Sequence, residues 1–524
     1  MKNKMKILLT IFCAIILVLA VKGKSGNPTE TTMNDLGWTT NGPFELSPER
    51  GRFALTYSLV ENKSVGFSIP VARFASPDVG YKDGRYVSLF AQGVSFLSIP
   101  GYLIGKFFGA SQVGAFLTSS FFAIFNFILI RVLAKRLGAS NLFSTIGGLI
   151  FLFATPAFTY ATTLYQHHIS TFLILSSIYA LINFDDFKGL MVIFFLYSFG
   201  VSIDYPNAFI MFPILIYSLG KLISKKVRKD KTFFAFHVGK IITILAVVPP
   251  LIFFIWFNNL SYGSPTQLAG TVESVAVVNE RGFPIFKSVN EIKNEEKQEE
   301  EKKLEVLDRG NSALAYFKTR NLRNGLFILL ISSDRGVIFY VPVLIFFILG
   351  FRQMRKNENN IAQLLILLMG TNLILYSMWG DPWGGWAFGS RYLIPSYALA
   401  SIFLSLGLKN LVRQKILLVI FYILLAYSVA INTAAAVTSN SNPPKIEAIA
   451  LEEISGKIER YSVDRNFDYL TQNKSKSYFF NEAFSEKISL WTYYTFVSVG
   501  IFLVITSLMT YTVMYVDKKL DKYD

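Results

Sequence analysis

Cysteine and histidine are nearly absent from this sequence, which has one cysteine and three histidines in 524 residues. Cys13 stands alone inside an apolar run, so no disulfide can form within the chain and no cysteine-based metal site is available. His167 and His168 are adjacent, but His237 is distant in the sequence, so a histidine-built zinc site would lack ligands. Neither a disulfide framework nor a structural zinc site is therefore expected.

Charge is scarce inside the long apolar runs, and these runs are the most prominent feature of the chain. Hydrophobic residues make up 52% of the sequence, aromatic residues make up 15%, and the mean hydropathy is +0.42. Stretches such as 7–21 and 121–130 are too apolar and too frequent for a soluble globular protein. Because backbone polar groups in lipid must be satisfied within the segment, the spans should be helices. The sequence predicts an all-α polytopic membrane protein.

About twelve spans are predicted from runs long enough to cross a hydrocarbon core of roughly 30 Å. The first follows the basic start MKNKMK and resembles a signal peptide, but no convincing cleavage site follows it, so it is interpreted as an uncleaved anchor. The predicted spans are 6–21, 112–133, 140–157, 167–184, 188–203, 206–223, 237–257, 336–351, 361–379, 390–408, 415–436 and 489–516.

The net charge of +16 is explained by topology and does not require a nucleic-acid partner. With the N-terminus in the cytoplasm, every inner loop carries several basic residues, as the positive-inside rule requires. These loops are 131–136, 221–231, 352–356, 409–415 and 517–524. We therefore expect a multi-pass protein of the cytoplasmic (inner) membrane.

Three large loops then fall on the outer side, at 22–94, 258–325 and 437–488. The middle loop contains a run of mixed charge at 291–306, which is interpreted as a solvated helix or a disordered insertion. The apolar segment 95–109 is interpreted as an interfacial or re-entrant helix. Residues 1–436 are predicted to form one transmembrane module, 437–488 a loop of unknown role, and 489–524 the last span with a basic tail.

A set of polar, charged and aromatic residues lies, in this topology, at the outer membrane surface. They are Glu49, Arg50, Arg52, Asp78, Lys82, Asp83, Arg85, Tyr165, His167, His168, Asp204, Tyr205, Asp334, Arg335, Asp381, Trp383, Trp386 and Arg391. Ion-coupled transporters usually need ionisable groups or broken helices near the middle of the membrane. The distribution instead favours chemistry at the lipid–water boundary, where an anionic lipid head group and a polar acceptor can meet.

Most of these residues also have simpler structural interpretations. Asp78 and Asp83 can form turns, the histidines can be interfacial hydrogen-bonding groups, and the tryptophans match an interfacial aromatic belt. Asp334 and Arg335 can form a structural ion pair. The segment GGWAFGSRYLIP (384–395) is harder to explain in this way. Its glycines, its arginine and its proline-bearing helix start indicate an anion pocket.

The segment PERGRFA (48–54) resembles a motif of the GT-C membrane glycosyltransferases, which take sugars from polyprenyl-phosphate donors. This class includes protein O-mannosyltransferase and aminoarabinose-transferase types. Their pattern after the first span is Pro-Asp-Glu-x-Arg-aromatic-Ala. The alignment places Glu49 where the catalytic Asp of the family stands and Arg50 where its Glu stands. The second acid is therefore missing here or is supplied elsewhere.

Four further segments are similar to elements of that family, in the same order along roughly residues 1–410. They are SPDVGYKDGRYVSLFAQGVSFLSIPGYLIG (76–105), LYQHH (164–168), SSDRGVIFYVP (332–342) and GGWAFGSRYLIP (384–395). The first departs from the family, which usually has Pro-Gly where this chain has Gln92-Gly93. The sequence beyond 437 matches no element of the family.

The resemblance implies an inverting transfer of a sugar from a polyprenyl-phosphate donor to a glycan, lipid or protein acceptor on the outer face. Glu49 is the expected base, Asp78 is the competing candidate, and Asp83 is a third catalytic candidate. The donor phosphate is expected to meet Arg391 first, then Arg335, Arg85 and Lys82. Substrate contacts are expected from His167, His168, Tyr392 and Asp381.

Cofactors, sugar and acceptor remain open at this point. Asp78 and Asp83 are spaced so that Mg²⁺ or Mn²⁺ could bind with water and phosphate, and no other cofactor is indicated. The alternative functions are a transporter or flippase of lipid-linked glycans and a polysaccharide polymerase or ligase. The first alternative would need polar residues through the membrane, which are scarce here, and the second would also act on the outer face.

Overall fold

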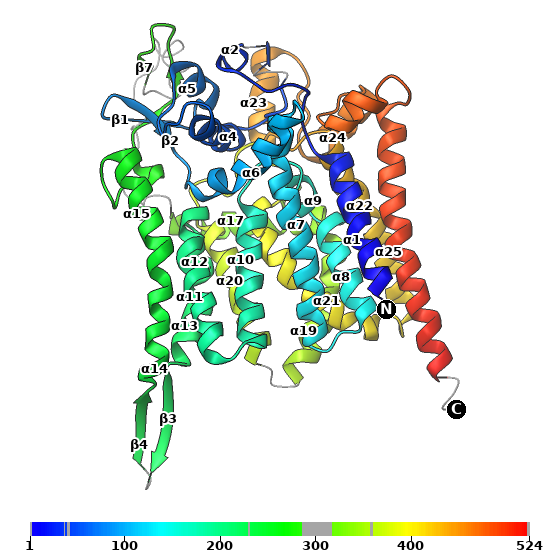
Figure 1. Cartoon of the computed structure of the whole chain (residues 1–524). Coiled ribbons are helices and arrows are strands. Elements are labelled where there is room, and N and C mark those ends of the chain that lie inside the picture. Colours follow the sequence, from blue (N-terminus) through cyan, green and yellow to red (C-terminus); the bar gives the residue numbers. More distant parts are fainter. Residues whose placement is uncertain are drawn as a thin grey trace.

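Long helices stand side by side in the computed structural model of the chain, and shorter helices and strands cover one end of them (Figure 1). The structure describes residues 3–35, 37–38, 42–228, 231–285, 317–356 and 360–520. Helices make up most of this part of the chain and its strands are short, so the predicted all-α class is confirmed. The predicted charge run at 291–306 lies outside the described residues.

Nine of the predicted spans contain an essentially unbroken helix within the described part of the chain. These helices are α1 (Asn3–Ala20), α7 (Ser111–Arg136), α8 (Asn141–Phe153), α10 (His167–Asn183), α11 (Asp186–Ile203), α20 (Asn360–Ser377), α21 (Ile394–Leu411), α22 (Lys415–Val437) and α25 (Leu490–Leu520). The one-turn helices α9 (Ala157–Tyr160) and η6 (Arg391–Leu393) lie beside α8 and α21 in the sequence.

The other three predicted spans are broken helices, each with proline at or near the start of a segment. They consist of α12 (Asn207–Ile210) with α13 (Phe212–Gly220); α14 (Val238–Ile241) with η1 (Ile242–Val247) and α15 (Val248–Tyr262); and α18 (Val337–Tyr340) with η5 (Pro342–Phe346) and α19 (Phe347–Lys356). Proline lacks a backbone N–H and cannot donate to the preceding turn, so a new segment starts there. Pro213 and Pro342 occupy such positions.

Seven helices in the described residues are long and apolar enough to cross a membrane by themselves. They lie at 111–136, 186–203, 238–262, 360–377, 391–411, 415–437 and 490–512. The chain is therefore described as a multi-pass membrane protein. The predicted interfacial segment forms α6 (Gly93–Phe107), whose Phe107 is 84% exposed. Gly101 and Gly105 of α6 meet Gly114 of α7 so closely that an added Cβ would lie within 3 Å of the opposite backbone.

The three loops that were predicted to lie outside supply the layer that covers one end of the bundle. The first loop forms α2 (Glu30–Asn34), α4 (Ser47–Val60), α5 (Ile69–Ala75), β1 (Val79–Lys82) and β2 (Arg85–Ser88). The middle loop adds η2 (Ala269–Thr271), β5 (Ser274–Val275), β6 (Val277–Val278), β7 (Pro284–Ile285), η4 (Thr319–Asn321) and α17 (Leu322–Leu330), and the third forms α23 (Lys445–Ser455), α24 (Ser462–Thr471) and η7 (Phe480–Phe484). Strand β1 pairs antiparallel with β2 and β5, and β6 pairs with β7.

The opposite end of the bundle carries a hairpin of β3 (Ile223–Arg228) and β4 (Lys231–Phe236), which projects away from the helices (Figure 1). The sequence predicted a plain basic loop there. The described C-terminal end of the chain lies toward the same end, and the elements of the three outer loops lie at the other (Figure 1). This segregation agrees with the predicted assignment of basic and outer loops to opposite sides.

The loop 437–488, for which no role was predicted, packs on the first loop. Gly23 and Lys476 are joined by a backbone hydrogen bond, as are Val21 and Tyr478. The Lys476 ammonium also donates to the carbonyl of Gly42 at 2.7 Å. Residues 437–488 therefore form part of the layer that surrounds the start of α4.

Candidate functional site

Helix α4 places Glu49 and Arg52 at the inner side of the covering layer. Pro48 stands in the first turn of α4, where its missing N–H costs nothing and its fixed φ suits a helix start. Glu49 is fully buried and Arg52 is 3% exposed. The Arg52 guanidinium lies over the ring of Phe90, 4.6 Å from its centroid, and donates to the carbonyl of Pro48 at 3.0 Å.

Glu49 belongs to a buried hydrogen-bond network that joins three distant segments. Its Oε1 accepts from the side-chain amide of Asn440 at 2.7 Å, and its Oε2 accepts from the backbone N–H of Glu45 at 3.2 Å. The Lys22 ammonium donates to Glu45 Oε2 at 2.7 Å and to Asn440 Oδ1 at 2.9 Å. Glu45 also accepts from the backbone N–H of Asn440 at 2.8 Å. Asn440 thus holds both carboxylates in fixed positions.

The two carboxylates of this network have opposite electrostatic behaviour. Burial raises the pKa of Glu49 to about 7, with Lys22 and the Asn440 amide opposing the shift and Glu45 adding to it. Burial also acts to raise the pKa of Glu45, but Lys22 and Lys476 outweigh it and the pKa is lowered. Glu45 is therefore the ionised partner of Lys22, and Glu49 is poised to exchange a proton near neutral pH.

Tyr165 is the centre of a second group of side chains, which we call the Tyr165 cluster and define as Arg52, Tyr165, His167, Arg391 and Tyr392. The Arg391 guanidinium lies 5.1 Å from the Tyr165 ring centroid and 5.3 Å from that of Tyr392. Arg52 lies 5.7 Å from the Tyr165 centroid. The His167 ring is stacked on Tyr165 at 5.6 Å and contacts Tyr392 edge-on at 6.3 Å.

The network around Glu49 is electrostatically coupled to the Tyr165 cluster. The pKa of the Tyr165 phenol is raised by burial first and by the Glu49 carboxylate next, while Arg391 and Arg52 act to lower it. Both arginines and Glu49 therefore lie close enough to act on the same hydroxyl. The sequence predicted that Glu49 and Arg391 serve one site, and that role stays a prediction.

The Tyr165 cluster concentrates buried polar atoms that have no partner among the described residues. They are Nε and Nη1 of Arg391, Nε of Arg52, Nε2 of His167 and the hydroxyl of Tyr165. Buried polar groups in proteins are almost always hydrogen-bonded. The arginine atoms can only donate, and the tyrosine hydroxyl can donate. The cluster therefore suits a ligand rich in acceptor oxygens, such as a phosphate.

Two more carboxylates border the cluster. Asp78 accepts from the Ser47 hydroxyl at 2.5 Å, and Asp204, at the end of α11, accepts from the side chain of Gln166 at 3.1 Å. The pKa of Arg52 is lowered to about 10 by burial, and both Asp204 and Asp78 oppose this shift. Burial also raises the pKa of Asp204. Asp78, the predicted competing base, is half-buried and lies within electrostatic reach of Arg50 and Arg52.

The predicted residues Lys82, Asp83 and Arg85 lie at a hairpin tip and are not brought into the Tyr165 cluster. Strands β1 and β2 are joined by Asp83 and Gly84, whose φ angles of 49° and 76° form the tight turn. Asp83 and Arg85 are exposed. The sequence allowed Asp83 to be either a catalytic candidate or a turn residue, and the structure shows the turn.

Asp78 and Asp83, the predicted metal ligands, lie too far apart to bind one ion. Asp78 precedes β1 and Asp83 follows it, so at ~3.3 Å per residue the extended strand separates them by roughly 16 Å. Among the described residues, no group of three or more His, Cys, Asp or Glu side chains is placed to hold a metal ion. A magnesium or manganese ion shared by Asp78 and Asp83 is therefore not supported by the geometry.

His168 and Asp381 have structural partners in place of the predicted substrate. His168 Nε2 lies 2.7 Å from the carbonyl of Ala157, and Asn126 donates to the His168 carbonyl at 2.8 Å. Asp381 is exposed and accepts from the backbone N–H groups of Trp383 at 3.1 Å and Gly385 at 2.6 Å. Its carboxylate thus folds the loop before Arg391, in which Gly384 and Gly385 have φ angles of 71° and 65°.

Arg335 supports the same loop and is not free to receive a donor phosphate. Its guanidinium donates to the carbonyls of Trp383, Asp334, Gly385 and Asn442 at 2.7–2.9 Å. The side chain is fully buried. The sequence predicted Arg335 as a phosphate ligand, or in the simpler interpretation as the partner of Asp334. The structure shows neither, because the guanidinium caps backbone carbonyls.

We expect Arg335→Ala to lower the free energy of unfolding by about 3 kcal/mol or more, because four buried or partly buried carbonyls lose their charged donor. Thermal unfolding of the purified protein in detergent should show a lowered Tm. The Tm of Arg335→Lys should lie between those of Arg335→Ala and the unaltered protein, because one ammonium replaces only some of the guanidinium donors. An unchanged Tm combined with lost sugar transfer would instead support the phosphate role predicted from the sequence.

Sequence reasoning missed Glu45, Lys22 and Asn440. The family-like motif has Arg50 where the family has a second acidic residue. Glu45, four residues before Glu49, is the acidic residue that shares the hydrogen-bond network of Glu49. Lys22 follows the first span as an ordinary flanking lysine, and Asn440 is one of several polar residues in TSNSNPP (438–444). No local pattern distinguishes either residue.

Comparison with known proteins adds a loose likeness of the whole chain. No protein-family model matches the sequence, and no curated protein sequence matches it. The crystal structure of ArnT from Cupriavidus metallidurans in the apo state aligns with 97% of this chain and 78% of that chain, at 11% identity and a TM-score of 0.46. The crystal structure of ArnT from the same organism bound to undecaprenyl phosphate aligns with 98% of this chain and 78% of that chain, at 11% identity and a TM-score of 0.45. Likeness at this level says nothing about individual residues.

Proposed function

We propose that this chain is a membrane glycosyltransferase, which moves a sugar from a polyprenyl-phosphate donor to an acceptor hydroxyl. The observation that supports this most directly is the buried Arg391 guanidinium, which has two unpartnered donor atoms and lies beside the network of Glu49. A lipid-linked sugar phosphate needs these two features together. The phosphate requires fixed donors, and the acceptor requires a carboxylate near neutral pKa.

The proposed step is a direct displacement at the anomeric carbon. Glu49 takes the proton of the acceptor hydroxyl while the acceptor oxygen forms a bond to that carbon. The bond between the carbon and the phosphate oxygen breaks, and its electron pair leaves with the polyprenyl phosphate. Arg391 and Arg52 stabilise the charge that develops on the departing phosphate. One displacement inverts the configuration of the sugar, and no covalent enzyme intermediate is needed.

Asp78 is the second candidate for the base in this step. Its carboxylate is less buried than that of Glu49 and is already engaged by Ser47 and faced by the charges of Arg50 and Arg52. Glu49 has the more suitable environment, because burial dominates over its cationic neighbours.

The reaction is proposed to take place on the outer face of the cytoplasmic membrane. The end of α19, the end of α21 and the hairpin β3–β4 lie at the end opposite the covering layer, and all three are rich in basic residues (Figure 1). Basic residues are retained on the cytoplasmic side during insertion. The Tyr165 cluster, which lies beneath the covering layer, then faces outward and meets the donor lipid from the outer leaflet.

The proposal is tested by reconstituting the purified chain in vesicles that contain a panel of radiolabelled polyprenyl-phosphate sugars. Added cell-envelope fractions supply acceptors. We expect release of free polyprenyl phosphate together with a labelled acceptor product for one donor of the panel. Donor that crosses the bilayer uncleaved would establish the flippase alternative and refute the transferase.

A further inference from the structure

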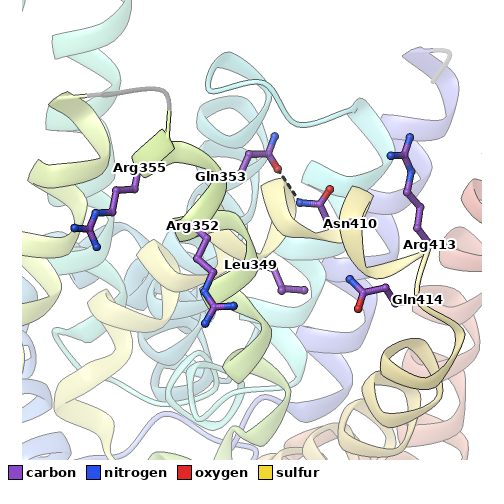
Figure 2. A pocket seen from close by; sticks show the side chains of 7 residues that line it. All are labelled: Leu349, Arg352, Gln353, Arg355, Asn410, Arg413 and Gln414. Carbon is purple, nitrogen blue, oxygen red and sulfur yellow. Dashed lines mark hydrogen bonds between the residues drawn. The ribbon is translucent and has the colours of Figure 1, made fainter.

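Two neighbouring cavities at the end opposite the Tyr165 cluster have no role in the proposed transfer. The first, of about 830 Å³, lies between α19 and the end of α21 and is lined by Arg352, Arg355 and Arg413 among others. In Figure 2, Arg352 and Leu349 of α19 lie opposite Asn410 of α21, with Arg355 and Arg413 at the two sides. Asn410 and Gln353 are joined by a hydrogen bond of 3.5 Å.

The second cavity, of about 1310 Å³, is a groove between α1 and α25, with parts of α8 and α21 also lining it. Gln353 lines both cavities, so the two are adjacent. The walls of the groove are mainly apolar and include Leu8, Leu9, Leu503 and Leu508. Lys4 and Lys409 stand among its lining residues.

Charge and apolar surface are arranged along the groove in the order that a phospholipid requires. Lys4 is in the first turn of α1 and Lys409 is in the last turn of α21, so both stand at the end of the bundle. Leu8 follows Lys4 by one helical turn, about 6 Å farther along the helix axis. A phosphate at the membrane surface would meet the two ammonium groups, and acyl chains would extend along the leucines.

The positive charge of both cavities is uncompensated within the described part of the chain. No acidic residue is among the described residues that line either cavity. Lys4, Lys409, Arg352, Arg355 and Arg413 form no ion pair or side-chain hydrogen bond there, although Lys221 and Lys240 of the same end are paired with Asp186. The charge complementarity therefore favours an anionic occupant, and the apolar groove favours one with hydrocarbon chains.

We infer that this end of the protein binds an anionic phospholipid of the adjacent leaflet. The phosphate lies between Lys4 and Lys409, the acyl chains fill the groove between α1 and α25, and the arginine-lined cavity adds positive potential beside the head group. Basic residues near an anionic membrane surface each contribute about a fivefold factor in binding. The inference is independent of the proposed transferase activity, because the two sites are at opposite ends of the bundle.

The test is native mass spectrometry of the purified full chain with phosphatidylglycerol and with zwitterionic phosphatidylcholine. We expect phosphatidylglycerol to be retained preferentially, and Lys4→Ala/Lys409→Ala to weaken its binding roughly thirtyfold. The matched control, Lys135→Ala/Lys188→Ala, removes the same charge from residues that line neither cavity and should bind like the unaltered protein. Equal retention of both lipids, or equal losses in both double variants, would refute the inference.

A second pair of variants tests the groove without changing charge. Ser507→Trp fills the groove from α25 and should reduce phosphatidylglycerol retention, whereas Val499→Trp on an exposed position of the same helix should not. Glycerol phosphate, which lacks acyl chains, should fail to compete at concentrations at which the lipid binds. Full competition by glycerol phosphate, or a dimer that Ser507→Trp dissociates, would overturn the lipid assignment.

Discussion

Replacing Arg391 with alanine is expected to lower the rate of sugar transfer by about 10²–10³-fold, the usual cost of removing a donor that meets developing charge. The side chain is 8% exposed, and its Nε and Nη1 have no partner among the described residues. In the proposed mechanism these donors meet the departing phosphate. Because Arg391→Ala breaks no hydrogen bond made by those two atoms, we expect the Tm to fall far less than in Arg335→Ala.

The measurement is release of polyprenyl phosphate from the donor identified in the vesicle assay, at saturating acceptor. Arg391→Lys should retain part of the rate, because an ammonium keeps the charge but loses the planar fork. Arg85→Ala is the matched control, since that arginine is exposed at the β1–β2 hairpin tip and should transfer sugar normally. If Arg85→Ala were as damaging as Arg391→Ala, the donor phosphate would not bind at the Tyr165 cluster.

Replacing Glu49 with glutamine is expected to lower sugar transfer by about 10²–10⁴-fold, the range typical for loss of a general base. Glutamine has nearly the same shape but cannot accept the acceptor proton. Glu61→Gln, which removes a carboxylate paired with Lys106 at the far end of α4, should leave the rate unchanged. Asp78→Asn measured in parallel distinguishes the two candidate bases, and a larger loss there than in Glu49→Gln would reassign the role.

The pH dependence of the unaltered enzyme gives a second readout for Glu49. The base must be ionised, and burial raises its pKa to about 7, so the rate should rise with pH up to that value and level off above it. The Asn440 amide bonds to the ionised carboxylate and lowers its pKa, so Asn440→Ala should move the midpoint to higher pH. A midpoint near the ordinary glutamate value in both proteins would exclude Glu49 as the base.

The helical membrane class and the positions of the long helices could be predicted because they depend on local properties of the chain. Lipid requires each spanning segment to satisfy its own backbone groups, so a long apolar run is enough to indicate a helix. Each predicted span contains a helix, and the breaks within 206–223, 237–257 and 336–351 occur beside prolines. Proline explains those breaks, although each of the three spans was predicted as one continuous helix.

The candidate site was predictable only in part, because similar local signals have different uses. Arg335 and Arg391 both follow small polar residues in family-like motifs, yet Arg335 donates to four backbone carbonyls and Arg391 keeps unpartnered donors. Asp83 was predicted as a catalytic candidate, with a turn as the simpler interpretation, and it forms a hairpin turn with Gly84. A charged side chain bonds to the backbone or stays available to a ligand according to which carbonyls fold around it. The spacing of residues in the sequence does not show which carbonyls these are.

The sequence by itself determined that the chain is a helical membrane protein, that its basic loops are separated from its larger loops, and that Glu49 and Arg391 are candidates for one site. Only the tertiary structure decided which residues complete that site. Asn440 bonds to Glu49 across 391 positions of sequence, and Lys22 joins them from the end of α1. Helices form from contacts within a few residues, whereas this network forms only when the end of α1, the start of α4 and the loop 437–488 pack on one another, and no local periodicity encodes that packing.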